Sequence, residues 1–525
     1  MNELTTTPLK PVDIVVPASA APTSTAPVEN PFFVNVEGRF SGPAGEVLRI
    51  PGFYDGEKGW TVRFSPTAVG RWSYTIRCPE SRDVDGTTGS VDCVERPDGT
   101  PTPPGVLRVS ESHPTHFQFQ DGSYFFMNAY ECDWLWAVDL DKNDLSDTTT
   151  LVERVAAYGF NTVLMNVYAH DCRWTEGRTS ERDFGPPSLY AWEGTNDEPD
   201  HSRLNLAYFA HLDRVIELLA EHGIVVHLYL KVYNKMVNWP DRYSPEEDLY
   251  FRSVLARYQA YWNIIWDFSK ESFNEPDKDY LYNRISYMRS LDAYGHMVTT
   301  HDDHAYSGGR LHRGSIDFYT AQQHVDYYES AVTAKFRYGM PYLNSEFGYE
   351  HGPEGIDDYT YAVRQSPEEL VWRAWEVCMA GAYPAYYYTY TAWDVVDVTH
   401  APPGYRYFQI LYSFFSKLRF WELEPTLTFC RPRTARVLAR CGDGIAADEY
   451  VVFHHARDRG GALVTEGIDL GEYDGEWMNI FTGETVPLGP DNCARRGNPE
   501  GPHANWSLTL PFEEKTGVLH LIKRG

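Results

Sequence analysis

Two glutamates that end strand-like segments are the residues of this chain best suited to chemistry. An apolar run over residues 263–271 ends on Glu271, and a second run over residues 341–348 contains Glu346. Two more strand-like runs lie between them, at 297–300 and 318–322. In a barrel of eight alternating strands and helices, this spacing places the carboxylates at the ends of strands four and seven, on the catalytic face. A carboxylate pair across that face is suited to cleaving a glycosidic bond.

Eight short apolar or aromatic runs predict the barrel that would position this pair. Helical patterns separate many of them, and the clearest covers residues 204–222, which Gly223 ends. Near-continuous apolar strands joined by helices are typical of a parallel sheet buried on both faces. The sequence therefore predicts an α/β fold, a TIM (β/α)8 barrel, over residues 115–424. The eight runs are 124–129, 162–168, 224–230, 263–268, 297–300, 318–322, 341–345 and 385–390.

The two flanks of the barrel have a different pattern. Residues 31–110 alternate in short strand-like runs broken by Gly and Pro, which favours an N-terminal β-sandwich. Residues 425–525 are similar and predict a C-terminal β-sandwich. Residues 1–30 are rich in Pro, Ala, Ser and Thr and are expected to form a flexible tail. Short connections lead us to expect that both flanking domains support the barrel rather than bind polysaccharide.

Charge and composition limit the classes of molecule that this chain is expected to bind. The 525 residues carry a net charge of −28, which repels nucleic acid and anionic membranes. No apolar run is long enough for a membrane helix, and no export signal is recognisable at the N-terminus, so we expect a cytoplasmic protein. Homo-oligomers are compatible with the sequence. The scattered cysteines and the absence of a phosphate-binding glycine motif predict no cofactor.

The chain resembles a family. Residues 60–66 with 70–72 are similar to the small β-sandwich that precedes many bacterial clan A glycoside hydrolase barrels. The barrel resembles the apiosidase-like branch of that clan, on the segments 124–127, 266–271, 294–301 and 344–348. Residues 473–483 resemble the β-sandwich that often closes such proteins. In the clan, the strand-four glutamate is the general acid/base and the strand-seven glutamate is the nucleophile. The resemblance therefore implies these roles for Glu271 and Glu346.

One residue departs from the clan pattern. Many members carry Asn before the acid/base, whereas this chain has Lys270. The tripeptide Asn274-Glu275-Pro276, found at that position in other branches, lies just beyond, which makes Glu275 a rival acid. Glu271 is favoured because it directly follows the strand.

Further polar and aromatic residues follow the predicted strands and would surround a sugar. We expect substrate contacts from Asp133, Trp134, Asn166, Tyr168, His170, Lys231, His301, Asp302, Gln323, His324 and Trp393. The run from His301 to His304 also contains ligand types suited to zinc or manganese. Metal-dependent barrels usually begin with a histidine pair on strand one, which is absent here, so no metal is expected.

Together these features predict a retaining glycoside hydrolase that removes a terminal sugar from a short oligosaccharide or glycoside. An endo-acting or transglycosylating relative, or a non-catalytic carbohydrate-binding barrel, remains as an alternative. The sugar, the anomer and the linkage are not encoded in any recognisable motif.

Overall fold

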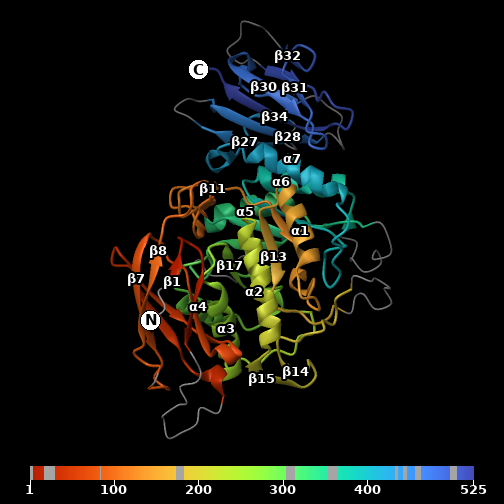
Figure 1. The fold of residues 1–525 in the computed structure, drawn as a ribbon. Coiled ribbons are helices and arrows are strands. Elements are labelled where there is room, and N and C mark those ends of the chain that lie inside the picture. The colour runs from red at the N-terminus through yellow and green to blue at the C-terminus, as the bar shows by residue number, and fades with distance from the viewer. Residues whose placement is uncertain are drawn as a thin grey trace.

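A ring of parallel strands lies at the centre of the computed structural model (Figure 1). The structure describes residues 4–16, 30–82, 84–172, 183–302, 314–352, 364–431, 435–441, 446–455, 463–496 and 505–525. Around the central sheet the strand order is β18-β17-β16-β13-β12-β24-β21-β20-β19, and each recorded pair is parallel. The end strands β18 (Val298–Thr299) and β19 (His301–Asp302) are separated only by Thr300, so the sheet nearly closes into a barrel. The others are β12 (Ala129–Glu131), β13 (Thr162–Asn166), β16 (Val225–Val232), β17 (Ile264–Lys270), β20 (Tyr319–Gln322), β21 (Tyr342–Glu346) and β24 (Tyr383–Tyr387).

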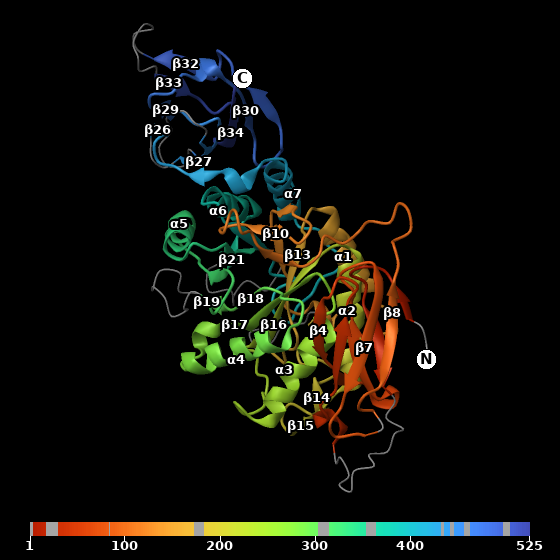
Figure 2. The same ribbon diagram turned by 90° about the vertical axis from the view of Figure 1, so that its left-hand side faces the viewer.

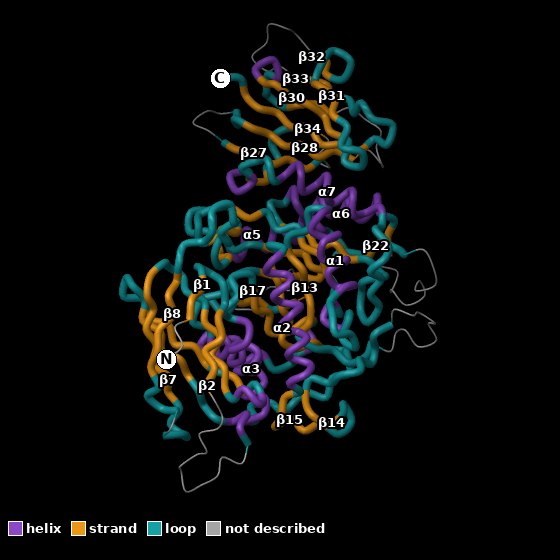
Figure 3. Tube along the Cα trace, viewed as in Figure 1, coloured by secondary structure: helices purple, strands orange, loops and turns teal. Residues whose placement is uncertain are grey.

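Helices cover the outside of this barrel (Figure 3). Their starts follow ordinary capping chemistry: the side chains of Ser244 and Ser366 each accept a backbone N–H of the first turn, and a proline follows each serine. The predicted helix 204–222 is α2, and Asn205 caps it. The helices are α1 (Ser146–Ala157), α2 (Leu206–Glu221), α3 (Pro245–Tyr258), α4 (Lys278–Leu291), α5 (Tyr327–Tyr338), α6 (Pro367–Met379) and α7 (Pro403–Phe415).

A small antiparallel sheet lies against the N-terminal end of the barrel and corrects two predictions. It consists of β9 (Leu107–Val109), β10 (Phe117–Phe119) and β11 (Tyr124–Phe125). The ring of Phe117 packs 5.2 Å from Phe318 and 4.9 Å from Tyr383, at the starts of two barrel strands. The run 124–129 is therefore not strand one, which is β12 instead, and the boundary predicted at residue 110 divides this sheet. The sequence pattern could not separate them, because β11 of the small sheet and β12 of the barrel are both short and mainly apolar.

Two sheets form the N-terminal part of the molecule, and they include residues predicted to be a flexible tail. One sheet has the order β1-β8-β7-β3-β4 and the other β2-β6-β5. Residues 17–29 of the predicted tail lie outside the described residues, but β1 and β2 are ordered strands because each pairs along a neighbour, and Ile14 and Val16 point into the shared core. The strands are β1 (Leu4–Thr6), β2 (Val12–Val16), β3 (Glu37–Ser41), β4 (Val47–Pro51), β5 (Phe53–Tyr54), β6 (Trp60–Phe64), β7 (Gly70–Arg77) and β8 (Thr88–Cys93).

The N-terminal sheets are joined to the barrel by buried charges. Arg63 on β6 donates to the carbonyl oxygen of Arg257 at 3.1 Å and pairs with Asp213 at 3.1 Å. Arg257 in turn pairs with Asp55 at 3.2 Å. Four charged side chains from different elements are thus fixed at one seam, which gives this junction a defined geometry.

Two further sheets at the C-terminal end pack on α6 and α7 (Figure 2). Arg436 pairs with Glu376 of α6 at 2.7 Å, and the rings of Phe453 and Trp375 lie 5.7 Å apart. That both flanks are β-sandwiches stays a prediction. The orders are β25-β27-β28-β34-β30-β31 and β26-β29-β33-β32, formed by β25 (Glu424–Pro425), β26 (Cys430–Arg431), β27 (Arg436–Arg440), β28 (Glu449–His455), β29 (Leu463–Thr465), β30 (Tyr473–Met478), β31 (Thr485–Pro487), β32 (Cys493–Arg496), β33 (Asn505–Leu508) and β34 (Thr516–Lys523).

Two short pairings complete the fold. After β13 the chain forms a hairpin of β14 (Trp192–Gly194) and β15 (Pro199–Leu204), and after β21 it pairs β22 (Tyr349–Glu350) with β23 (Arg364–Gln365). Within the described residues, no helix has both the length and the apolar character needed to cross a membrane.

Candidate active site

The two glutamates follow barrel strands as the sequence predicted. Glu346 is the last residue of β21, and Glu271 comes directly after β17. Both are buried, with exposed fractions of 2% and 7%. Glu271 has a left-handed backbone with φ 55° and ψ 40°, which is uncommon for a residue other than glycine. Such conformations concentrate at functional sites, where the surrounding structure holds them.

One imidazole links the two strand ends. The backbone N–H of Glu271 donates to Nδ1 of His301 at 3.3 Å, and His301 Nε2 lies 3.2 Å from Oγ of Ser345, the neighbour of Glu346. Burial lowers the pKa of His301 to about 3, so the ring is neutral at physiological pH. Because Nδ1 accepts, the single hydrogen lies on Nε2 and is donated to Ser345. His301 therefore bridges the ends of β17 and β21 at the site.

Glu271 is surrounded mainly by neutral amides. Its Oε2 accepts from Asn234 Nδ2 at 2.6 Å, and Asn274 Nδ2 lies 3.5 Å away. Burial raises the pKa of Glu271, and the charge of Glu346 adds to that effect, while Lys235 and Lys270 oppose it. The net shift is upward, so the protonated form of this carboxyl is favoured relative to a carboxyl in water.

Glu346 is surrounded by groups that favour its charged form. Lys270 Nζ lies 3.0 Å from Oε1, and the hydroxyl of Tyr349 donates to Oε2 at 2.5 Å. Burial alone would raise the pKa of Glu346, but Lys270, His301 and Tyr349 outweigh it and lower the pKa to about 2. This carboxylate is therefore ionised at any pH at which the protein would work.

Lys270 gathers three carboxyl groups around one ammonium. Besides Glu346, its Nζ bonds Glu131 and lies 2.8 Å from Oδ2 of Asp133. Tyr387 donates to that same oxygen of Asp133 at 2.6 Å. Burial raises the pKa of Glu131 well above its ordinary value, and Lys270 opposes that rise. Three carboxyl groups therefore share one buried ammonium, and the protonated form of Glu131 is favoured relative to a carboxyl in water.

A glycine after the strand brings Tyr349 to Glu346. Gly348 has φ +149°, and a Cβ there would lie 1.9 Å from Oε1 of Gln365. That same oxygen accepts the backbone N–H of Tyr349 at 2.8 Å. Only glycine lets the chain turn and approach Gln365 so closely, which fixes the tyrosine hydroxyl on the carboxylate.

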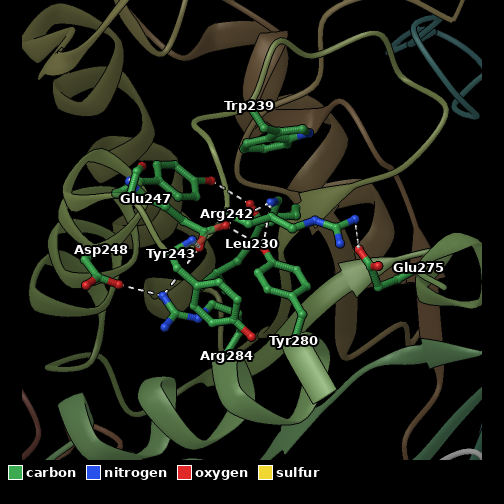
Figure 4. A network of polar contacts seen from close by, with 12 residues as sticks. Leu230, Trp239, Arg242, Tyr243, Glu247, Asp248, Glu275, Tyr280 and Arg284 are labelled. Carbon is green, nitrogen blue, oxygen red and sulfur yellow. Dashed lines mark hydrogen bonds and ion pairs between the residues drawn. The ribbon is translucent and has the colours of Figure 1, made fainter. Parts of the chain in front are cut away.

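Glu275 lies in a separate network (Figure 4). Its Oε2 accepts from Arg242 at 2.7 Å and from the Tyr233 hydroxyl at 2.5 Å, and its Oε1 accepts the backbone N–H of Asp277. Both of its oxygens therefore bond donors of the protein itself, which makes this carboxyl group poorly suited to bonding the oxygen of a departing sugar.

The predicted substrate contacts divide by position. Asp133 and His301 are bonded within the site, and Asn166 is bonded to it through its backbone N–H, which donates to Asp133 O at 3.0 Å. The Asn166 side-chain amide is buried, and neither of its polar atoms has a partner in the described part of the chain. Trp134 is buried and stacked on Trp136, with ring centroids 5.2 Å apart. Tyr168 is buried among rings, and its hydroxyl lies 3.2 Å from Nδ1 of His170.

The remaining predicted contacts are more varied. Lys231 belongs to the network of Glu275, since it bonds Glu247 and Tyr280. The Trp393 ring lies 5.3 Å from that of Tyr349, and His324 lies 6.4 Å from the same ring. Gln323 donates its backbone N–H to the carbonyl oxygen of Glu346. The side chain of Asp302, with Asp303 and His304, lies outside the described residues.

Sequence reasoning missed several site residues. Asn234, Tyr349 and Tyr387 each donate to one of the carboxyl groups described above, and Glu131 accepts from Lys270. Tyr229, the register neighbour of Asn166, has a buried hydroxyl that, like the Asn166 amide, has no partner among the described residues. Tyr387 and Glu131 follow the inward alternation of their strands, which could have flagged them. Asn234 is on a loop and left no periodic signal.

This geometry, with two strand-end carboxyls in opposite environments on a parallel barrel, is that of a carbohydrate-cleaving barrel. Residues 112–422 match the family model described as "Apiosidase-like, catalytic domain", and residues 14–79 match a domain of unknown function, DUF5060. The first match covers more than half of the chain, so this protein belongs to the apiosidase-like family. It is a glycosidase, which confirms the resemblance drawn from its residues.

Solved structures share the fold. A candidate glycoside hydrolase from Bacteroides vulgatus has a TM-score of 0.77 at 16% identity, covering 99% of this chain and 100% of its own. A family 5 glycoside hydrolase from the same organism has a TM-score of 0.56 at 16% identity, covering 82% and 96%. A further glycoside hydrolase has a TM-score of 0.58 at 14% identity, covering 81% and 98%. A search of curated proteins found no match.

Proposed function

We propose that this glycosidase retains anomeric configuration, with Glu346 as nucleophile and Glu271 as general acid/base, and that it releases a terminal sugar from a short oligosaccharide or glycoside. The observation that carries this assignment is the difference between the two carboxyl environments. The pKa of Glu271 is raised chiefly by burial, while that of Glu346 is lowered to about 2 by Lys270, His301 and Tyr349 against burial. An acid must hold a proton and a nucleophile must not.

The reaction runs in two displacements. Glu346 attacks the anomeric carbon while the glycosidic C–O bond breaks, and the Glu271 proton passes to the departing oxygen. Glu271, now ionised, takes a proton from water, whose oxygen bonds the anomeric carbon while the bond to Glu346 breaks. Both residues return to their starting states, and the net change is the addition of one water across the bond.

The chain's other residues bind and orient the sugar. The unpartnered amide of Asn166 and the hydroxyl of Tyr229 offer a donor and acceptors to sugar hydroxyls, and the Trp393 ring offers a stacking face. Lys270 holds the nucleophile in its charged form and in place. Action at a terminal sugar is supported by the burial of both glutamates, because a long polymer needs an open groove across the carboxylates.

A trapping experiment tests this assignment. Incubation with a panel of 2-deoxy-2-fluoro glycosides, followed by peptide mass mapping, should label Glu346. Proton NMR of the first product formed should show the anomer of the substrate. A label on another carboxyl group, or the inverted anomer, would refute the retaining assignment. A panel of nitrophenyl glycosides and plant oligosaccharides would then identify the sugar.

A further inference from the structure

The outward face of the larger N-terminal sheet carries a cluster of arginines. On this face, Arg39 of β3 lies directly opposite Arg49 of β4 and, on its other side, opposite Thr75 of β7. In the next row, Glu37 lies between Pro51 and Arg77. On the other side of the Arg39 row, Ser41 lies between Val47 and Ser73. Strands β7 and β8 lie at the outer edge of the molecule in Figure 1, and the opposite face of the sheet is packed in the core.

The side chains of these arginines are not held by other groups in the described part of the chain. Arg39, Arg49 and Arg77 are exposed, and none of their guanidinium groups makes an ion pair or hydrogen bond with a described residue. By contrast, Arg71 on the same sheet donates to Ser90 at 2.8 Å and lies 3.8 Å from Asp92. Like charges directly opposite each other on adjacent strands destabilise a sheet. A chain with a net charge of −28 nevertheless places two arginines there.

The cluster lines a hollow. About 530 Å³ of space is bounded by the three arginines, by the hydroxyl residues Ser41, Ser73 and Thr75, and by Glu37 and Asp85. Asp85 is engaged with the backbone N–H of Cys78, and Glu37 lies opposite Arg77 rather than in the row of Arg39 and Arg49. The volume is within the range of small-molecule sites.

A plain solvated sheet face is the alternative explanation. Such faces carry polar residues, and charges of both signs then pair across strands, as Arg71 and Asp92 do. Arg39 and Arg49 break this rule at the centre of the hollow. Guanidinium groups bind carboxylates through two parallel hydrogen bonds, and hydroxyl side chains bind sugar hydroxyls. Paired arginines flanked by serines and a threonine therefore match a sugar that bears a carboxylate.

We propose that this face of the N-terminal domain binds a short acidic oligosaccharide, with a uronate carboxylate between Arg39 and Arg49 and sugar hydroxyls on Ser41, Ser73 and Thr75. The acidic surface elsewhere disfavours long polyanions, which restricts the site to short ligands or chain ends. The inference is independent of the catalytic assignment, and it revises the expectation that the flanking domains only support the barrel.

Calorimetric titration of the full chain carrying Glu346→Gln tests the proposal, because this substitution prevents turnover during binding. The probe is a short oligomer of galacturonic acid. Replacing both Arg39 and Arg49 with Gln should weaken binding about tenfold or more, because the carboxylate loses both of its charged hydrogen-bond donors. Raising the salt concentration should weaken binding to the parent chain.

A matched variant controls for charge alone. Arg71→Gln with Arg495→Gln removes the same two charges from exposed arginines outside the hollow, and it should change the affinity less than about twofold. In an otherwise unmutated chain, the Arg39 and Arg49 substitutions should leave hydrolysis of a small nitrophenyl glycoside unchanged and should not lower the melting temperature, because they remove a repulsion between opposite residues of the sheet.

Several outcomes would overturn the inference. They are absence of binding, equal binding of a neutral galactose oligomer, and equal loss in the charge-matched control. Undiminished binding in the Arg39/Arg49 variant would place the oligomer elsewhere, and equal binding of a sulfated neutral oligomer would refute carboxylate recognition. Failure of the fluorosugar trapping would leave this result untouched, because the difference in affinity between the Arg39/Arg49 variant and the charge-matched control does not depend on which carboxyl group is the nucleophile.

Discussion

Glu271 and Glu275 are four residues apart and are surrounded by opposite kinds of partners. Near Glu271, the described carboxyl groups of Glu131, Asp133, Glu271 and Glu346 outnumber the ammonium groups of Lys235 and Lys270. Around Glu275, the acids Glu247, Asp248 and Glu275 meet as many cations, namely Lys231, Arg242 and Arg284 (Figure 4).

The ratio of carboxyl groups to cations distinguishes a site suited to catalysis from one that only stabilises the fold. Where buried carboxyl groups exceed cations, some of them must hold protons, because adjacent like charges in a buried site repel. Where the numbers match, each carboxylate can stay ionised and bonded. A site that must move a proton needs the first arrangement, and a site that only fixes helices and loops needs the second.

Removal of the nucleophile should have the largest effect. Glu346→Gln should lower kcat by at least about a thousandfold with the fold intact, because an amide cannot form the glycosyl-enzyme. Steady-state kinetics and circular dichroism check this. Glu350→Gln is a matched control, since Glu350 is equally buried four residues later but bonds Tyr386 at 2.7 Å. A comparable loss in both variants would contradict a chemical role for Glu346.

Removal of the acid/base should come next. Glu271→Ala should slow cleavage of substrates with poor leaving groups about a hundredfold or more, and much less for nitrophenyl leaving groups that need little protonation. Azide should restore part of the second step by replacing activated water, giving a glycosyl azide detectable by mass spectrometry. If azide rescues Glu275→Ala instead, Glu275 is the acid/base and Glu271 is not.

Lys270→Gln should reduce activity about tenfold and change the pH profile. In the native enzyme, kcat/KM should fall as the pH rises through the raised pKa of Glu271 and should have no acid limb until the pH approaches about 2. Loss of the Lys270 charge should move the acid limb up, toward the ordinary glutamate pKa of about 4.3. Lys335→Gln is the control, because Lys335 is also buried but bonds Gly381 O at 2.8 Å. It should lower the melting temperature without moving the limb, and an unmoved limb in Lys270→Gln would exclude the proposed role.

The same groups set the acid stability of the fold. Because the pKa of Glu346 is lowered on folding, this residue contributes stability that is present above about pH 4.3 and is lost as the pH falls toward about 2. In Lys270→Gln, the melting temperature should depend less on pH between pH 2 and 5, because the pKa of Glu346 is then lowered less on folding. Thermal melts across this pH range check the expectation.

Glu275→Gln should have the smallest catalytic effect, within about twofold on kcat, because its partners are structural. It should lower the melting temperature, since Arg242 and Tyr233 lose a charged acceptor. Arg242→Gln should have a similar effect. A kcat loss matching that of Glu271→Ala would show that both arrangements take part in the chemistry.

Sequence pattern predicted the barrel and its two strand-end glutamates because burial on both faces leaves near-continuous apolar runs. It misplaced strand one, since Tyr124 and Phe125 pair outside the barrel with the same apolar character as a barrel strand. It also missed β1 and β2, whose few apolar residues are hidden in a polar, proline-rich context. Asn234 reaches Glu271 from a loop and Tyr349 reaches Glu346 from the short strand β22, and only folding brings Glu131 and Asp133 to Lys270.

The pairing of β1 and β2 has a consequence for handling the protein. β1 covers one edge of β8, and β2 covers one edge of β6. A shortened chain that begins at residue 31 would keep every barrel residue. It would leave β6 and β8 each with an edge of unpaired backbone donors and acceptors. Such edges are templates for pairing with other molecules. We expect this shortened chain to self-associate into particles during purification, visible by light scattering, while the full chain does not.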